Sequence, residues 1–279
     1  MSEHKKQFEK KIILITGSTQ GLGAETARLV ARRGAEAIII AGRSEKNGKK
    51  VKEEIEKIGS ECFFIKTDLE SIDDCRNLID LTDKKYGRID SLINCAGNTE
   101  RGTILNTTPE LFDSMFNVNI KAPFFLIQDT VKIMRRENIK GTIGVVATMA
   151  AYSGMPFIAP YSASKGALII LVKNLGNSLA RDQIRINALN IGWTDTPGED
   201  SIQKKYHNAK ENWLEEAEKK MPFNKLTKSI DVAKGLAFIC SEESGIMTGS
   251  IIDFDQSIAG FHSYSAYDAP ILKETKTGQ

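Results

Sequence analysis

Tyr161 and Lys165 are the residues of this chain whose types and spacing most clearly allow chemistry. They stand four positions apart, so on a helix their side chains share one face. A free tyrosine has a pKa near ~10 and exchanges protons poorly at neutral pH, whereas a lysine ammonium beside it favours the phenolate and lowers that pKa. The pair is therefore a candidate acid and base. Because such pairs also arise by chance on surface helices, its meaning depends on the rest of the chain.

A glycine-rich turn near the N-terminus predicts a dinucleotide site. Gly17, Gly21 and Gly23 directly follow an apolar run at 12–16 and open a segment with helical periodicity. Glycines here allow a tight turn and a close approach of the backbone to a pyrophosphate, and the helix N-terminus offers free N–H groups and positive dipole charge. The residues expected to line the phosphates are Gly17, Thr19, Gln20, Gly21, Leu22 and Gly23.

The end of the second expected strand bears on the choice of dinucleotide. An acidic residue there would bond the ribose hydroxyls and repel a 2′-phosphate, but this chain has Gly42 followed by Arg43. The guanidinium of Arg43 can bind that phosphate or stack on adenine. The glycine turn holds Gln20 rather than a second arginine. The sequence therefore predicts NADP(H) in preference to NAD(H).

The composition bounds the class of protein. The chain has 279 residues, 41% hydrophobic and 27% charged, with a net charge of +2. This length fits one large α/β domain, and so mild a charge does not indicate nucleic acid or an anionic membrane as partner. No apolar run approaches the length of a membrane span. The four cysteines and three histidines lack metal-ligand spacing, so we expect reduced thiols, a cytoplasmic protein and no metal site.

Short β-branched runs alternate with segments of helical periodicity. This alternation predicts a single-domain, doubly wound α/β Rossmann fold, with a parallel sheet of about seven strands flanked by helices. We expect strands at 12–16, 37–41, 62–66, 89–94, 142–148, 184–190 and 250–254. We expect helices at 22–33, 45–58, 72–86, 111–138, 162–180 and 231–240.

The chain is expected to divide into a flexible N-terminal lead at 1–10, a dinucleotide-binding catalytic domain at 11–260 and a C-terminal tail at 261–279. The segment at about 194–227 departs from the strand–helix alternation, with Pro197-Gly198 and a charged amphipathic stretch at 204–220. Ligands of open α/β sheets bind beyond the carboxyl ends of the strands. This segment is expected either to cover the substrate or to form a solvated surface helix.

Taken together, these motifs resemble those of the short-chain dehydrogenase/reductase family over residues 11–256. The Gly-x-x-x-Gly-x-Gly turn and Tyr-x-x-x-Lys pair occur with the family's other motifs in the same order. The resemblance implies that Asp68 and Leu69 contact the adenine, and that Asn94, Ala96 and Gly97 border the ribose. It places Asn119 in the catalytic tetrad. It also places Gly192, Thr194 and Thr196 in the loop that holds the nicotinamide.

Two positions depart from the family pattern. The catalytic serine of the family falls on Thr148, which keeps a hydroxyl donor but adds a methyl group and a stiffer χ1. Ser153 is the other candidate, but it lies beyond the expected strand end, so we favour Thr148. The second departure is Ile191, where the family usually has a proline before Gly192. This change is expected to affect loop rigidity more than chemistry.

The resemblance implies a reaction between a secondary alcohol and a ketone. Thr148 and Tyr161 would bind the carbonyl oxygen, Tyr161 would transfer the proton, and Lys165 would lower the pKa of Tyr161 and hold the nicotinamide ribose. Asn119 would place a water that links Lys165 to solvent. Several polar residues could line the site and bond the hydroxyls of a small sugar- or polyol-like substrate. They are Glu199, Asp255, Gln256 and His262. These residues could instead serve the C-terminal tail or a subunit contact.

Two alternatives to this function remain open. A 3-oxoacyl thioester reductase would share the motifs, although the nearly balanced charge shows no basic face for an acidic carrier protein. A non-catalytic dinucleotide-binding scaffold or sensor would keep the fold without the reaction, and Thr148 leaves that possibility open. The family also implies a homodimer or homotetramer formed through the helices expected at 111–138 and 162–180.

Overall fold

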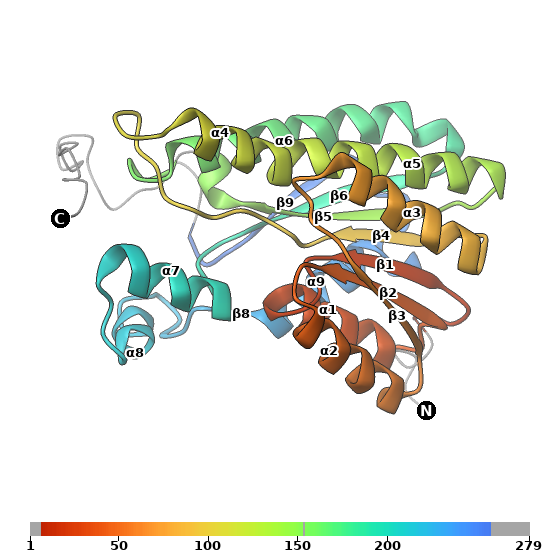
Figure 1. The fold of residues 1–279 in the computed structure, drawn as a ribbon, viewed down its shortest axis with the longest axis horizontal. Coiled ribbons are helices and arrows are strands. Elements are labelled where there is room, and N and C mark those ends of the chain that lie inside the picture. The colour runs from red at the N-terminus through yellow and green to blue at the C-terminus, as the bar shows by residue number, and fades with distance from the viewer. Residues whose placement is uncertain (1–6, 153, 258–279) are drawn as a thin grey trace.

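The computed structural model describes residues 7–152 and 154–257. Its centre is a parallel sheet of seven strands in the order β3-β2-β1-β4-β5-β6-β9 (Figure 1). The strand order reverses between β1 and β4, which confirms the predicted doubly wound fold. The strands are β1 Ile12–Thr16, β2 Ala37–Gly42, β3 Glu61–Lys66, β4 Ser91–Asn94, β5 Thr142–Thr148, β6 Arg185–Ile191 and β9 Ile251–Phe254.

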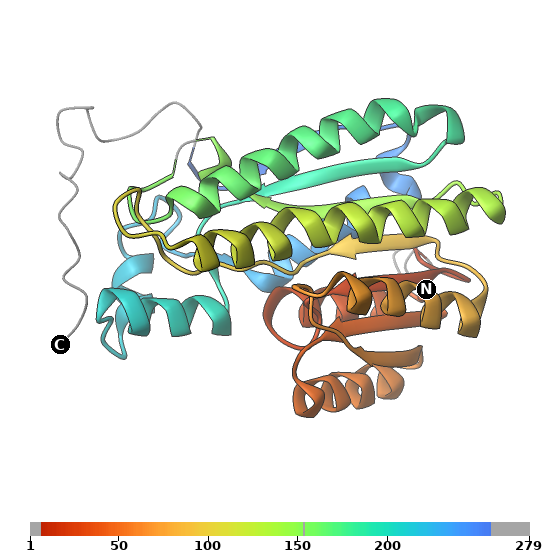
Figure 2. The same cartoon turned by 45° about the horizontal axis from the view of Figure 1, so that its top comes forward.

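Helices cover both faces of this sheet. One layer contains α1 Gly21–Arg32, α2 Glu45–Ile58 and α9 Ser229–Ile239 (Figure 1). The other contains α3 Ile72–Tyr86, α4 Pro109–Phe116, α5 Ala122–Arg136 and α6 Ala159–Ser178. The long α5 and α6 run side by side over the sheet in both Figure 1 and Figure 2. None of the described helices has both the length and the apolarity needed to cross a membrane.

The sequence of β1 shows why two helical layers form. Its residues are apolar or buried along the whole strand, and successive side chains of a strand point to opposite faces. Ile13 and Ile15 join the core beneath α1 and α9, whereas Ile12 and Leu14 join the core beneath α3, α5 and α6. Leaving either face in water would expose a row of large apolar side chains, so both faces are covered.

The expected helix at 111–138 is instead three consecutive pieces. Thr108 caps α4, which ends at Phe116, and a π-helical turn at Asn117–Lys121 leads into α5. The extra residue of a π turn shifts side chains around the helix axis, and such turns occur frequently at functional sites. The helix expected at 162–180 also starts earlier, at Ala159, because Pro160 suits a first helical turn.

The segment at 194–227 folds into a small excursion beyond the carboxyl ends of the strands (Figure 1). It contains α7 Pro197–His207 and α8 Trp213–Glu218, and β7 Thr194–Asp195 pairs with β8 Thr227–Lys228. The stretch expected to be amphipathic at 204–220 is interrupted at Asn208, whose φ of 49° ends α7. The segment is therefore two short helices rather than one surface helix.

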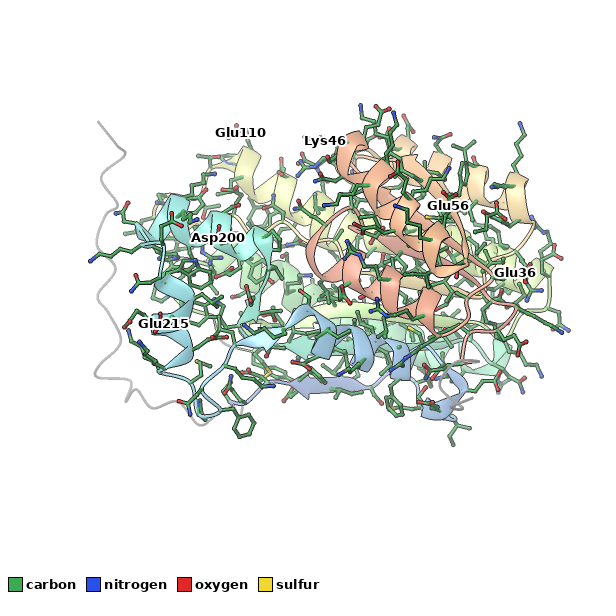
Figure 3. The ribbon with its side chains drawn as sticks, turned by 90° about the horizontal axis from the view of Figure 1, so that it is seen from below. Glu36, Lys46, Glu56, Glu110, Asp200 and Glu215 are labelled. Carbon is green, nitrogen blue, oxygen red and sulfur yellow. The ribbon has the colours of Figure 1, made fainter. Side chains whose placement is uncertain are left out.

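Trp213 gives this excursion a core of its own. Trp213 packs with Ala217 and Leu226, and its ring stacks on Trp193 at a centroid distance of 6.0 Å. Its indole N–H donates to Asp200 on α7 at 2.8 Å. Figure 3 shows Asp200 on α7 and Glu215 on α8. These contacts hold the two helices in one place over the sheet edge.

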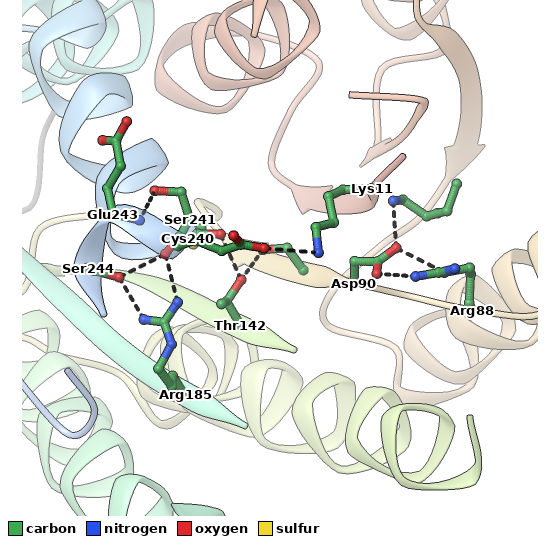
Figure 4. A network of polar contacts seen from close by, with 12 residues as sticks. Lys11, Arg88, Asp90, Thr142, Arg185, Cys240, Ser241, Glu243 and Ser244 are labelled. Carbon is green, nitrogen blue, oxygen red and sulfur yellow. Dashed lines mark hydrogen bonds and ion pairs between the residues drawn. The ribbon is translucent and has the colours of Figure 1, made fainter. Parts of the chain in front are cut away.

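A polar network closes the opposite end of the sheet, where the strands begin (Figure 4). The Arg185 guanidinium donates to Ser241 O at 2.7 Å and to Ser244 Oγ at 2.6 Å, which joins β6 to the end of α9. Asp90 Oδ2 accepts from Ile12 N at 2.8 Å and fixes the start of β1. These partners satisfy groups at the end of the sheet farthest from the excursion.

Asn187 generates a stability prediction. Its fully buried amide donates to Met247 O at 2.8 Å and accepts from Ser250 N at 3.0 Å, so it joins β6 to the start of β9. Asn187→Ala leaves the Ser250 N–H without this acceptor, and we expect a loss of about 1–3 kcal/mol in the free energy of unfolding, measured by urea denaturation.

Asn177→Ala, on the exposed face of α6, is the matched control and should change stability by less than about 0.5 kcal/mol. Equal stabilities for the two variants would contradict the role of Asn187.

Candidate active site

The candidate site lies at the carboxyl edge of the sheet, around β1, β4, β5 and β6. Thr16 at the end of β1 pairs with Asn94 at the end of β4, and Thr148 at the end of β5 pairs with Ile191 of β6. Because the chain winds in opposite directions on either side of β1 and β4, the loops that follow them diverge and leave a crevice. The residues predicted for cofactor and catalysis follow these strand ends.

The glycine turn is shaped by close backbone packing. Gly17 has a φ of +63°, and a Cβ atom there would lie 2.7 Å from the Ala96 Cα atom. A Cβ atom on Gly23 would overlap the carbonyl group of Gly17. Side chains at either position would push the turn away from the strand that it follows. The turn therefore presents bare backbone and the start of α1, as phosphate binding requires.

A buried donor next to this turn supports the fit of a dinucleotide. Asn94 Oδ1 accepts from Thr16 Oγ1 at 3.4 Å, but its Nδ2 is buried without a hydrogen-bond partner among the described residues. Buried amide donors are rarely left unpaired. Thr19 packs on Gly42, where a Cβ atom would lie 2.8 Å from Thr19 Oγ1. The turn and the Asn94 amide thus form a polar cradle that a ribose and a pyrophosphate can fill.

The residues predicted for the adenosine end lie at the ends of β2 and β3. Arg43 directly follows β2, is exposed, and has no ion-pair or hydrogen-bond partner among the described residues. Asp68 follows β3 and accepts from Glu70 N at 3.1 Å, while Leu69 packs against the core. Gln20 is exposed at the tip of the turn. The fold therefore places Arg43 and Asp68 at the same edge as the glycine turn.

Tyr161 lies in the first turn of α6, opposite Thr148. Tyr161 is partly exposed, and burial of its hydroxyl raises its pKa to about 12, while a hydrogen bond with Thr148 acts to lower it. Thr148 Oγ1 also accepts from Ala150 N at 3.2 Å, which orients its side chain. In this structure the pKa of Tyr161 is thus raised rather than lowered, contrary to the expectation for a neighbouring lysine. Ser153 lies outside the described residues.

Lys165 is itself buried at this edge of the sheet. Its side chain is 3% exposed, and Nζ donates to Val146 O at 2.9 Å. Burial lowers the pKa of Lys165 to about 8. A Cβ atom on Gly97 would lie 3.5 Å from Lys165 Nζ and 3.6 Å from Asn119 Oδ1, so the ammonium and the amide meet at the bare backbone of Gly97.

Asn119 is held in place by three hydrogen bonds. It sits in the π turn and is fully buried. Its Oδ1 accepts from Asn98 N at 2.7 Å, and its Nδ2 donates to Asn98 O at 2.9 Å and to Ser164 Oγ at 3.0 Å. Ser164 Oγ donates in turn to Tyr161 O at 2.8 Å. Asn119 therefore ties the loop after β4 to the turn that carries Tyr161, through a serine that sequence reasoning did not single out.

The loop predicted to hold a nicotinamide follows β6. Ile191 pairs with both Thr148 and Phe254, so it extends β6 to the start of this loop. Thr194 Oγ1 donates to Gly192 O at 2.9 Å, and Thr196 Oγ1 accepts from Glu199 N at 3.0 Å as the cap of α7. A Cβ atom on Gly21 would lie 3.8 Å from the Thr196 Cβ atom. The loop thus returns to the glycine turn, and the two border one space.

The polar residues suggested for the substrate do not gather in one place. Glu199 faces the site, and its charge acts on Tyr161 after the larger effect of burial. Gln256 instead accepts from Phe223 N at 3.0 Å and donates to Lys225 O at 2.8 Å, so it anchors the excursion. Asp255 packs against Gly192, and His262 lies outside the described residues.

Arg101 is a charged residue of this site that sequence reasoning missed. It lies in the loop after β4, and its charge also acts on Tyr161, again after burial. Its guanidinium approaches Glu199 at 3.7 Å and His207 Nε2 at 3.4 Å. The only signal in the sequence was a charged pair, Glu100-Arg101, shortly after an expected strand.

Comparisons with known proteins agree with this geometry. A protein-family model described as Enoyl-(Acyl carrier protein) reductase matches residues 17–262. An uncharacterized oxidoreductase of Thermotoga maritima is 35% identical over 248 residues, covering 89% of this chain and 97% of the relative. A 3-oxoacyl-[acyl-carrier-protein] reductase of the same organism is 30% identical over 249 residues, covering 89% and 98%.

A solved structure shows the same arrangement of elements. An actinorhodin polyketide ketoreductase variant with NADPH superposes with a TM-score of 0.85 at 25% identity, and the match covers 90% of this chain and 98% of that one.

The burial of Lys165 predicts a pH-dependent contribution to stability. Its pKa of about 8 lies below its ordinary value of 10.5, so the unfolded chain binds more protons between these values. The free energy of unfolding therefore gains as the pH rises through this window. We expect the stability of the wild type, relative to Lys165→Met, to increase from about pH 8 to about pH 10 in urea denaturation.

Lys173→Met removes an exposed lysine from the same helix and controls for the loss of a charge. A wild-type advantage over Lys165→Met that stays flat or shrinks with pH would contradict the burial of Lys165.

Proposed function

This chain belongs to the short-chain dehydrogenase/reductase family, and we propose that it is a nicotinamide-dinucleotide-dependent oxidoreductase that interconverts a secondary alcohol and a ketone. One observation carries the proposal: Thr148, Tyr161, Lys165 and Asn119 come from three elements and converge at the sheet edge beside the glycine turn. A dinucleotide-binding fold alone does not imply this convergence.

The geometry supports a direct role for each residue. In the reducing direction, Thr148 and Tyr161 donate hydrogen bonds to the carbonyl oxygen and orient the carbon toward the nicotinamide. Because burial raises the pKa of Tyr161, its hydroxyl keeps a proton at neutral pH and can give it to the oxygen as the alcohol forms. When bound, the nicotinamide cofactor supplies or accepts the hydride.

Lys165 and Asn119 support this proton transfer. The Lys165 ammonium lies between Val146 O and the bare backbone of Gly97, where it can donate to a ribose hydroxyl and stabilise negative charge on Tyr161. Asn119 fixes the loop after β4 against the first turn of α6 and so positions both side chains. In the oxidising direction the same groups act in reverse, and Tyr161 accepts the alcohol proton.

For the cofactor we propose NADP(H) in preference to NAD(H). Arg43 is exposed at the end of β2, and its guanidinium has no other partner among the described residues. A 2′-phosphate would give it a charge-assisted hydrogen bond, which is roughly twice as strong as a neutral one.

For the substrate we propose a small polar ketone or alcohol of the sugar or polyol type. Two charged side chains support this class, because Arg101 and Glu199 form an ion pair at 3.7 Å and the charges of both act on Tyr161.

A 3-oxoacyl thioester reductase is the second candidate function. The 30% identical relative of Thermotoga maritima carries that name, and the matching family model is named for a related reductase. A panel of polyols, hydroxyketones and an acetoacetyl thioester, measured with the same cofactor, separates the two functions. A non-catalytic scaffold or sensor would bind the dinucleotide and turn over no member of the panel.

We also propose a homodimer or homotetramer in the cytoplasm. The helices expected to form the contact carry large apolar side chains that are exposed in the single chain: Phe112, Phe124 and Ile170. All four cysteines are unpaired thiols, as a reducing compartment favours. Sedimentation as a monomer, or recovery outside the cytoplasmic fraction, would contradict these assignments.

Tyr161→Phe tests the reaction. The variant keeps the ring and its packing but loses the proton donor, so we expect turnover to fall by about 10²–10⁴-fold while dinucleotide affinity stays within a few-fold of the wild type. The measurement is the rate of change in NADPH absorbance, with affinity from tryptophan fluorescence.

Tyr86→Phe is the matched control, because its hydroxyl donates to Glu61 at the start of the edge strand β3, at the amino end of the sheet. Near-normal turnover in Tyr161→Phe would sink the proposed role.

Arg43→Ala tests the choice of cofactor. Loss of a charged hydrogen bond of about 1.5–3 kcal/mol should lower the affinity ratio of NADPH to NADH by about 10–100-fold, almost entirely through weaker NADPH binding. Fluorescence titrations with both cofactors measure the ratio, and Arg181→Ala, an exposed arginine after α6, is the control. An unchanged ratio removes Arg43 from the phosphate site.

A further inference from the structure

A nearly buried ion pair, Arg101 with Glu199, acts on Tyr161 through its charges and has no part in the mechanism above. Arg101 comes from the loop after β4 and Glu199 from the first turn of α7, and their side chains are only 14% and 16% exposed. Phe157 and His207 complete the cluster, with their rings 5.0 Å apart. Long charged side chains are rarely so buried without a structural or a binding role.

The backbone fixes Arg101 relative to Tyr161. Gly102 N donates to Phe157 O at 2.9 Å, and Ala159 N donates to Gly102 O at 3.1 Å. Ala159 begins α6, which carries Tyr161 in its first turn. The guanidinium lies 5.6 Å from the centre of the Phe157 ring, within the range of a cation–π contact. Arg101 is thus held against the segment that leads into the catalytic helix.

Glu199 is fixed to the other side of the same space. Its Oε1 accepts from Trp193 Nε1 at 2.8 Å and from Gln203 Nε2 at 2.7 Å. Trp193 lies in the loop predicted to hold the nicotinamide, between Gly192 and Thr194. The Arg101–Glu199 pair therefore spans from the segment that carries Tyr161 to the loop that would carry the reacting ring of the cofactor.

The side chains of Arg101 and Glu199 are close but do not hydrogen-bond to each other directly. Arg101 Nη2 and Glu199 Oε1 are 3.7 Å apart, beyond direct hydrogen-bond distance. Nη1 donates to Thr99 O at 3.0 Å, and Nε approaches His207 Nε2 at 3.4 Å. Within the described residues, Arg101 Nη2 and Glu199 Oε2 have no hydrogen-bond partner. A donor and an acceptor thus stand close together between the segment that leads into α6 and the loop after β6.

We propose that Arg101 and Glu199 form a specificity site for a hydroxyl group of the substrate, next to the carbon that reacts at Tyr161. A hydroxyl has one donor and two acceptor positions, so a single group can accept from Arg101 and donate to Glu199. The substrate class is then a neutral vicinal diol or hydroxyketone. This inference rests on the proposed oxidoreductase function and adds a substrate requirement to it.

The charge of the cluster favours a neutral hydroxyl over other groups. Arg101 and Glu199 already balance each other, so a substrate carboxylate would place a second negative charge beside Glu199. Burial lowers the pKa of His207, and Arg101 lowers it further, so the imidazole adds no charge at neutral pH. An alkyl group in place of the hydroxyl would leave a donor and an acceptor unpaired, which is costly in a closed site.

A second ion pair between the same two segments provides a matched control. Lys205 Nζ pairs with Glu100 at 2.9 Å, and both side chains are more exposed than those of the inner pair. Tyr206 also donates to Glu100. Lys205→Met thus removes an ion pair between the loop after β4 and α7 and leaves the Arg101–Glu199 pair intact. An effect seen only in Arg101→Met then comes from substrate recognition and not from a weaker attachment of α7.

The test compares vicinal diols with their mono-hydroxy analogues, such as cyclohexane-1,2-diol and cyclohexanol, in the full-length protein with NADP⁺. We expect the wild type to favour the diols in kcat/KM by a factor on the order of 100 or more, since sites built to bond a hydroxyl reject analogues that lack it. Arg101→Met should reduce this ratio to below about ten, mainly through the diol. Lys205→Met should keep the wild-type ratio.

Three outcomes would overturn the inference: a wild-type ratio near one, an equal loss on both substrates in Arg101→Met, or an equal change of ratio in Lys205→Met. Turnover of an acetoacetyl thioester, but of no diol, would also overturn it while leaving the oxidoreductase function in place. If no carbonyl or alcohol substrate reacts although the cofactor binds, the proposed function itself fails. In that case we also expect the diol not to bind the protein–NADP⁺ complex, as followed by tryptophan fluorescence.

Discussion

The burial of a lysine ammonium at the end of β5 is the constraint on which the site depends. Moving a charge out of water is costly, and among the described residues Lys165, at 3% exposure, has one direct acceptor, the carbonyl of Val146. The bare backbone of Gly97 leaves room beside the ammonium, and the Asn119 amide closes that space. An incoming group with lone pairs, such as a ribose hydroxyl, would add an acceptor. The packing of α6, β5 and the π turn therefore buries this charge at a cost in free energy. The same packing leaves a space beside the ammonium where a bound ligand would reduce that cost.

Burial also sets the protonation of the two central groups in opposite senses. It raises the pKa of Tyr161 to about 12 and lowers that of Lys165 to about 8, because it disfavours the phenolate in one case and the ammonium in the other. Without cofactor, Tyr161 is thus protonated at neutral pH and is not an activated base. The spacing of Tyr161 and Lys165 on one helix face does not reveal that the phenol hydroxyl and the ammonium are both buried. The phosphates and ribose of a bound dinucleotide would add acceptors and negative charge near Lys165, which favours its charged form.

The sequence predicted the fold well because its strongest signals are local. The apolar run of β1 and the glycines that follow it specify a buried strand, a tight turn and a helix, and α2 and α3 begin and end where expected. Features that depend on tertiary contacts were not predictable. The π turn carries Asn119, which bonds Asn98 and Ser164, residues 21 and 45 positions away in the sequence. Likewise, no spacing in the chain indicates that Arg101 meets Glu199, because the fold brings them together from separate loops.

The residues proposed for catalysis and those proposed for substrate recognition also differ in what positions them, local elements in one case and tertiary contacts in the other. Thr148, Tyr161 and Lys165 are placed by strand ends and by one long helix, whose positions follow from the core. Arg101 and Glu199 are placed by a loop and by an excursion with a small core of its own around Trp213. Exposed ion pairs such as Glu100–Lys205 contribute little stability, so the hold of α7 over the site comes mainly from the Trp193–Glu199 bond and the tryptophan stack. Glu199 thus helps to hold the excursion in place and is also the residue proposed to bond the substrate hydroxyl, so the proposal couples the position of α7 to what occupies the site.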